Sequence, residues 1–118
     1  MKFVMLFVGT REDQDRWDAM SPAELERAMG GAGAWFEKYT KSGNITGGAQ
    51  LEGYKGVTTV SGQNGTKLVT DGPFIESKEV IGGLAIVTAK DLAEAQAMAK
   101  EWPGGPVEIW PAVEQSRA

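Results

Sequence analysis

The sequence predicts an α+β fold, a ferredoxin-like split βαβ plait with an inserted β-hairpin. The first observation is the order of the predicted elements, which runs β-α-β, then a hairpin, then β-α-β over the 118 residues. The second is that residues 2–9 and 80–88 are apolar at both odd and even positions, a pattern typical of strands covered on both faces. The plait places its first and third core strands at the centre of the sheet, and these two segments occupy those places.

The first helix is predicted from a strong start signal. Ser21 is the expected N-cap, Pro22 takes the first helical position, and Glu24 completes a capping box with Ser21. Apolar residues then recur at helical spacing, and Gly43 is a natural C-terminal cap. We therefore expect a helix that packs one apolar stripe against the sheet.

Two features are expected to limit the regularity of the N-terminal half. The charged segment 11–20, which precedes the helix, predicts a mobile connection anchored by Trp17. Gly30, Gly31 and Gly33 lie inside the helix, and each weakens a helix interior by about 1 kcal/mol. We therefore expect bending, or tight packing, in the middle of this helix.

The second half of the chain contains the predicted hairpin and the second βαβ unit. Residues 44–53 predict a strand that is interrupted by glycine and bulged at Gly47 and Gly48. Two short β-rich runs flank a Gly-Gln-Asn-Gly turn and predict a β-hairpin. The remaining elements are expected as a strand at 80–88, a helix at 91–102, a strand at 106–112 and a loose tail at 113–118. No linker or repeat interrupts the chain, so residues 1–118 are expected to form one domain.

Composition excludes several classes of function. The net charge of -4, without a basic stripe, argues against nucleic-acid binding. The absence of Cys and His removes Ser-His and Cys-His catalysis and the usual zinc ligands, so we expect no tight transition-metal site and no cofactor. No apolar run is long enough for a membrane span, and we expect a cytoplasmic protein without a membrane partner.

The apolar pattern of the two central strands also predicts the oligomeric state. Two helices can cover only one face of the predicted sheet, although both central strands are apolar on both faces. The other face needs a cover, and a second copy of the chain is the simplest one. We therefore expect a homodimer.

Nearly the whole sequence resembles a known family. The segment LVTDGPFIESKEVIGGLAIVTAKDLAEAQAMAKEWPGGPVEIWP is similar to the signature of the DGPF branch of the YCII-related family, and the MKFVMLFVG strand and the SPAEL helix are similar to that family's N-terminal half. The resemblance implies a dimeric α+β barrel in which two ferredoxin-like sheets face each other. Some members are similar to a dehydrochlorinase, and many DGPF proteins look linked to extracytoplasmic-function sigma factors. Other members carry a His-Asp pair regarded as catalytic, which this sequence cannot supply because it has no His.

The DGPF segment allows a structural and a functional interpretation. In the first, Asp71 caps a turn, the Gly-Pro pair shapes it, and Phe74 fills the core. In the second, the segment rims a ligand pocket and Asp71 acts as a general base, with a pKa raised by contact with Phe74. Residues of this candidate site are Tyr39, Asp71, Phe74, Glu76, Lys78, Glu79, Gly82 and Gly83. The aromatic cluster of Trp35, Phe36 and Tyr39 is interpreted mainly as core.

Three functions remain open at this point. The first is a small-molecule-binding or accessory homodimer, linked to sigma-factor-regulated responses. The second is a cofactor-free lyase- or isomerase-like enzyme that resembles a dehydrochlorinase, with Asp71 as base and Tyr39 or Lys78 polarising an unknown substrate. The third is a purely structural interaction module. A well-formed cavity lined by Asp71 favours the first two, and a pocket filled by Trp and Met favours the third.

Overall fold

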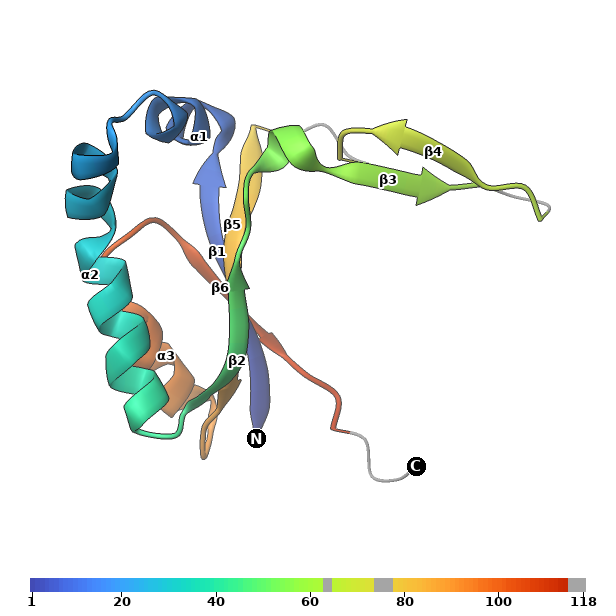
Figure 1. The fold of residues 1–118 in the computed structure, drawn as a ribbon. Coiled ribbons are helices and arrows are strands. Elements are labelled where there is room, and N and C mark those ends of the chain that lie inside the picture. The colour runs from blue at the N-terminus through green and yellow to red at the C-terminus, as the bar shows by residue number, and fades with distance from the viewer. Residues whose placement is uncertain (63–64, 74–77, 115–118) are drawn as a thin grey trace.

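The computed structural model describes residues 1–62, 65–73 and 78–114 of the chain. It shows an α+β architecture with antiparallel sheets, compatible with a ferredoxin-like fold (Figure 1). The elements are β1 (Lys2–Thr10), α1 (Arg11–Asp18), α2 (Pro22–Lys41), β2 (Ile45–Gln50), the short 3-10 helix η1 (Tyr54–Gly56), β3 (Thr58–Ser61), β4 (Leu68–Asp71), β5 (Glu79–Thr88), α3 (Leu92–Lys100) and β6 (Val107–Pro111). None of the helices in this described part is long and apolar enough to cross a membrane.

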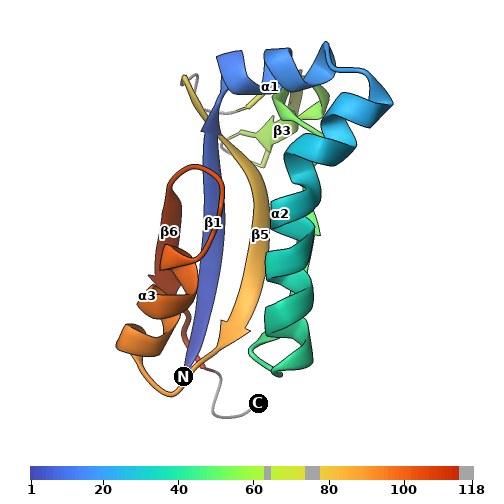
Figure 2. The ribbon, with the colours of Figure 1, turned by 90° about the vertical axis from the view of Figure 1, so that its left-hand side faces the viewer.

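The main sheet has the strand order that the sequence predicts. Among the described residues it is four-stranded, with the order β2-β5-β1-β6, and every neighbouring pair is antiparallel. The two doubly apolar strands, β1 and β5, are therefore central. Helices α2 and α3 lie over one face of this sheet, and α1 lies at the end of β1, as Figures 1 and 2 show from two sides.

The core lies between the helices and this face of the sheet. Alternate β1 residues point into it, and Phe3 and Met5 are at most 1% exposed. The intervening residues Val4 and Leu6 point to the opposite face, where they are only partly buried. The sheet therefore has one face in the core and one apolar face that no helix of the described chain covers.

The charged segment after β1 is a helix, so the prediction of a mobile connection is wrong there. Thr10 is the N-cap of α1, and it forms a reciprocal capping box with Asp13. Arg11 fixes the helix start, because its backbone N–H donates to the carbonyl oxygen of Lys78 at 2.8 Å and its guanidinium lies 4.7 Å from the centre of the Tyr54 ring. Local capping and these tertiary contacts outweigh the polar composition.

Helix α2 begins and ends as predicted. Ser21 and Glu24 form the capping box, and Gly43 follows the helix with a φ of 85°. Tight packing is found at Gly31, where an added Cβ would lie 3.3 Å from the Pro103 ring. The helix thus passes close to the segment after α3 at a residue without a side chain.

Strands β3 and β4 pair with each other and stand apart from the main sheet. Among the described residues they form a separate two-stranded antiparallel sheet, in which Val60 faces Val69. Figure 1 shows this pair, here called the β3–β4 arm, projecting on the side of the main sheet opposite to α2 and α3. Its apolar residues Val60, Leu68 and Val69 are 59%, 64% and 70% exposed. An isolated two-stranded ribbon is marginally stable in water, so the arm needs a surface to pack on.

Candidate functional site

A large cavity lies between α2 and the helix-covered face of the main sheet. Its volume is about 1070 Å³, which is at the upper end of the range for small-molecule sites. The lining comes from β1, α1, α2, β2, β5 and the connection between α3 and β6. Elements from both halves of the chain therefore build the cavity together.

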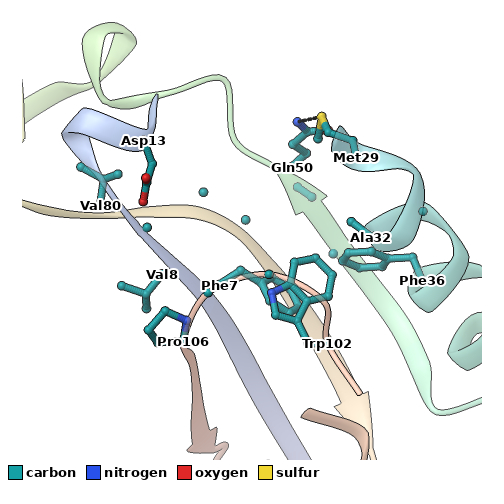
Figure 3. A pocket seen from close by; sticks show the side chains of 18 of the residues that line it. Phe7, Val8, Asp13, Met29, Ala32, Phe36, Gln50, Val80, Trp102 and Pro106 are labelled. Atoms are coloured by element: carbon teal, nitrogen blue, oxygen red, sulfur yellow. Dashed lines mark hydrogen bonds between the residues drawn. The ribbon is translucent and has the colours of Figure 1, made fainter. Parts of the chain in front are cut away.

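One end of the cavity is aromatic. Phe7 of β1 and Trp102, after α3, lie with ring centres 4.3 Å apart and an interplanar angle of 34°. Phe36 of α2 meets both rings nearly edge-on, at 5.6 Å from Phe7 and 5.9 Å from Trp102. Figure 3 shows these three side chains grouped on the cavity wall. Together they offer a flat and an edge surface for a second aromatic ring.

Half of the chain's glycines line the cavity, eight of 16. Some are required by close contacts, because an added Cβ would lie 2.6 Å from the Leu84 carbonyl oxygen at Gly48 and 2.7 Å from the Trp102 ring nitrogen at Gly104. At Gly33 in α2 an added Cβ would meet nothing within 4 Å. The glycines thus bring backbone close to the cavity and leave its volume open.

The other end of the cavity is polar. Asp13, near the start of α1, accepts a hydrogen bond at Oδ2 from the Thr10 backbone N–H at 3.2 Å, and its other oxygen pairs with Arg16. Figure 3 shows its carboxylate pointing from α1 toward the cavity. Glu79 lines the same end, because it pairs with Thr10 in the β1–β5 register. On the opposite rim, the Gln50 amide lies 3.8 Å from the Met29 sulfur.

The residues predicted from the DGPF segment are distributed over two places. Gly82, Gly83 and Glu79 line the cavity. Asp71 ends β4 in the arm, where it is exposed, and it is not among the lining residues; neither is Lys78. Phe74 and Glu76 lie outside the described residues.

Tyr39 packs against the core beside Trp35 and is not among the residues that line the cavity. Its hydroxyl donates to Glu101 Oε1 at 2.6 Å, and Lys38 Nζ lies 2.7 Å from the same oxygen. The Lys38 ammonium, followed by the Tyr39 hydroxyl, lowers the pKa of Glu101, whereas burial and the carboxylate raise the pKa of Tyr39. This cluster joins α2 to the end of α3. It has no lining residue, so it supports the fold around the cavity.

A second cluster fastens α1 to η1. Asp15 accepts from the Tyr54 hydroxyl at 2.9 Å and pairs with Lys55 at 3.1 Å. The hydrogen bond with Lys55, followed by that with Tyr54, lowers the pKa of the Asp15 carboxyl. This contact holds the acidic end of the cavity in place, because α1 carries Asp13.

In the described residues, no group of three or more Asp, Glu, His or Cys side chains is arranged to hold a metal ion.

The aromatic cluster of Trp35, Phe36 and Tyr39 is divided between two roles. Trp35 is core, at 4% exposure with its ring N–H donating to the Met98 carbonyl, whereas Phe36 also forms cavity wall. The interpretation of the cluster as core thus holds for Trp35 and misses the second role of Phe36.

Sequence reasoning also missed Asp13, Gln50 and the Trp102–Pro106 connection as cavity residues. One signal for Asp13 was present, because Thr10 stands three residues before it in a capping-box pattern. The other residues reach the cavity only through the tertiary fold.

Comparison with known proteins identifies the family of this chain. The sequence profile of the YCII-related domain matches residues 1–114. An uncharacterised protein of Rhizobium meliloti is 32% identical over 89 residues, which cover 75% of this chain and 72% of that protein. The family match over residues 1–114 therefore includes both the strands and the helices that build the cavity. This chain belongs to the YCII-related family.

Proposed function

We propose that this protein is a homodimer that binds a small organic molecule in the cavity between α2 and the sheet. The cavity itself carries the proposal. It has a volume of about 1070 Å³, and its walls are mainly apolar, aromatic or glycine residues with a few polar groups at one end. This combination is typical of ligand sites. Met29, Trp17 and Trp102 line the cavity and leave it open, which favours a binding protein over a purely structural module.

The homodimer is proposed from the uncovered face of the main sheet. Val4, Leu6, Leu84, Ile86 and Trp110 lie on this face. The accessible surface of the chain is 8368 Å², whereas a compact monomer of 12.6 kDa exposes about 6,200 Å². The excess, about 2,200 Å², is larger than the roughly 800 Å² that each partner of a stable complex buries. Two such sheets packed face to face would form the dimeric α+β barrel that the family resemblance implies.

The β3–β4 arm fits the same assembly. It is an inserted hairpin in this proposal, and it projects on the side of the uncovered face (Figure 1). The radius of gyration is 16.4 Å, against about 13.5 Å for a compact chain of this length. In the dimer the arm would lie along the second copy and bury Val60 and Val69.

Three finer predictions rest on the sequence alone. They are the DGPF branch of the family, the link to sigma-factor-regulated responses and the catalytic role of Asp71. The position of Asp71 on the arm, outside the cavity lining, gives the catalytic role no support. The proposed function is therefore binding.

The test uses two glycines of α2 that differ in one respect. An added Cβ would meet no neighbouring atom within 4 Å at either Gly30 or Gly33, but only Gly33 lines the cavity. Gly33→Leu should fill part of the cavity and weaken binding of the neutral fluorescent probe N-pentyl dansylamide by at least about tenfold, or 1.4 kcal/mol. Gly30→Leu should leave binding unchanged. Both variants should gain helix propensity equally, so circular dichroism and melting temperature serve as folding controls. Equal probe binding by wild type and Gly33→Leu would contradict a site in this cavity.

A further inference from the structure

We propose that the cavity selects an uncharged, flat aromatic molecule with one hydrogen-bonding substituent, and that Gln50 binds this substituent. The inference rests on the proposed function, and it adds the chemical class of the ligand and a residue that determines specificity. It follows from the pairing of the charged lining residues, from the position of Gln50 in the sheet and from the aromatic surface at one end of the cavity.

The charged groups of the lining already have partners. Among the described lining residues, the ionisable side chains are Asp13 and Glu79, and Lys and Arg are absent. Asp13 accepts from the Thr10 backbone N–H and pairs with Arg16, and Glu79 has a partner as well. A charged ligand of either sign would lose its hydration in the cavity without a free counter-charge, which is unfavourable. An uncharged ligand avoids this cost.

Gln50 has an amide that is only weakly bonded within the protein. Its amide nitrogen lies 3.8 Å from the Met29 sulfur, and a thioether is a weak acceptor. Figure 3 shows this contact between β2 and α2. By contrast, the amide of Gln14, which also lines the cavity, donates to Asp18 at 2.9 Å. A carbonyl or amide substituent of a ligand would therefore be a stronger partner for Gln50 than the sulfur is.

The sheet places Gln50 in one row with the aromatic end. Phe7 of β1 pairs with Gly83 of β5, and Gly83 pairs with Gln50 of β2. Directly paired residues lie on the same face of a sheet, so all three share the face that borders the cavity. Two strand spacings, about 10 Å, separate the backbones of Phe7 and Gln50. Gly83 carries no side chain between them, so a flat molecule can lie on the backbone with its rings toward Phe7 and its substituent at Gln50.

The aromatic end retains surface that the protein does not bury. Phe36 and Trp102 pack against the core, but both are only partly buried and both line the cavity. Trp102 lies against Phe7, and Phe36 meets Trp102 nearly edge-on, so a further ring can extend this packing. The small residues Ala32 and Gly33 line the cavity from α2. A flat ring system therefore fits between α2 and the sheet better than a globular apolar group.

The experiment compares three probes that have the same shape and differ in charge. At neutral pH 2-naphthamide is uncharged, 2-naphthoate is an anion and 2-naphthamidine is a cation. Isothermal titration calorimetry of the full chain should give an affinity for 2-naphthamide at least about tenfold above that for either ion. The compound 1-adamantanecarboxamide carries the same substituent on a globular body, and it should bind at least about tenfold more weakly than 2-naphthamide.

Substitutions of Gln50 test its role as the hydrogen-bonding partner. Gln50→Leu should weaken binding of 2-naphthamide about fivefold, without weakening binding of 2-methylnaphthalene, which has no hydrogen-bonding group. Gln50→Glu places a carboxylate at the same position, so this variant should bind 2-naphthamidine more tightly than the wild type does. Gln50 is exposed, so both variants should fold, and circular dichroism serves as the control.

The possible results separate this inference from the proposed function. If N-pentyl dansylamide binds but either ion binds as tightly as 2-naphthamide, the uncharged class is overturned and the binding function stands. Equal affinity for 1-adamantanecarboxamide would overturn the flat shape in the same way. An unchanged affinity of Gln50→Leu for 2-naphthamide, or an equal loss for 2-methylnaphthalene, would overturn the role of Gln50. A lack of saturable binding by every probe, N-pentyl dansylamide included, would overturn the binding function and this inference with it.

Discussion

Trp110 offers the sharpest test of the proposed dimer. It lies on β6 opposite Val4, on the uncovered face of the main sheet, and it is 56% exposed in the single chain. Trp110→Lys should therefore cost the isolated chain little, since the side chain is largely in water. In a dimer that covers this face, the same change would remove a large apolar contact and bury a charge.

The magnitude follows from the exposed area. A Trp side chain offers up to about 250 Å², so the exposed 56% corresponds to about 140 Å². At about 25 cal/mol per Å² its burial would contribute about 3.5 kcal/mol per chain and about 7 kcal/mol per dimer, as an upper limit. The dissociation constant should therefore rise by up to about five powers of ten.

Light scattering coupled to size exclusion at micromolar concentration measures the effect. Wild type should elute with a mass of about twice 12.6 kDa, and Trp110→Lys should elute at 12.6 kDa with an unchanged circular dichroism spectrum. The matched control is Leu92→Lys, because Leu92 is 44% exposed but begins α3, on the helix side. It should remain a dimer. A wild-type mass of 12.6 kDa, or a Trp110→Lys variant that stays dimeric, would refute the reasoning.

Two further predictions concern stability. Gly33→Ala should raise stability by about 1 kcal/mol, and the melting temperature by about 4 °C, because the helix gains propensity without a clash. Gly31→Ala should raise the melting temperature less than Gly33→Ala, since its Cβ would lie only 3.3 Å from Pro103. An equal rise for both variants would show that the added Cβ does not crowd Pro103. The Lys38 ammonium lowers the pKa of Glu101 below the ordinary 4.5, so the stabilising contribution is complete above that pH and is lost as the pH falls through the lowered value. The melting temperature of wild type should thus fall more steeply in acid than that of Glu101→Gln, and parallel curves would contradict the role of this ion pair.

The fold was predictable where the signal is local. The doubly apolar segments identified β1 and β5 as central, and the Ser21–Glu24 capping box located the start of α2. Helix α1 was missed because its sequence is polar apart from Trp17, and its stability comes from the Thr10 cap and from contacts with η1. Polar composition alone cannot distinguish such a helix from a loop.

The candidate site was predictable only in part, for a related reason. Gly82 and Gly83 were recognised because missing side chains in a central strand leave space. Asp13 became a cavity residue through the path of α1, which brings the acid over the end of β1. The position of Asp71 depends on the direction of the β3–β4 arm, and no pattern in the sequence specifies that direction.

The glycines of the cavity wall divide the site into a fixed and an adjustable part. An added Cβ at Gly48, Gly104 or Gly105 would lie less than 3.0 Å from a neighbouring atom, so a side chain at any of them would displace backbone or Trp102. Gly33 and Gly82 are free of such contacts. Single substitutions at these two positions would change the length and width of the cavity while the strands and the core stay as they are. Related chains on this scaffold can therefore acquire different ligand preferences in single mutational steps, without first losing stability.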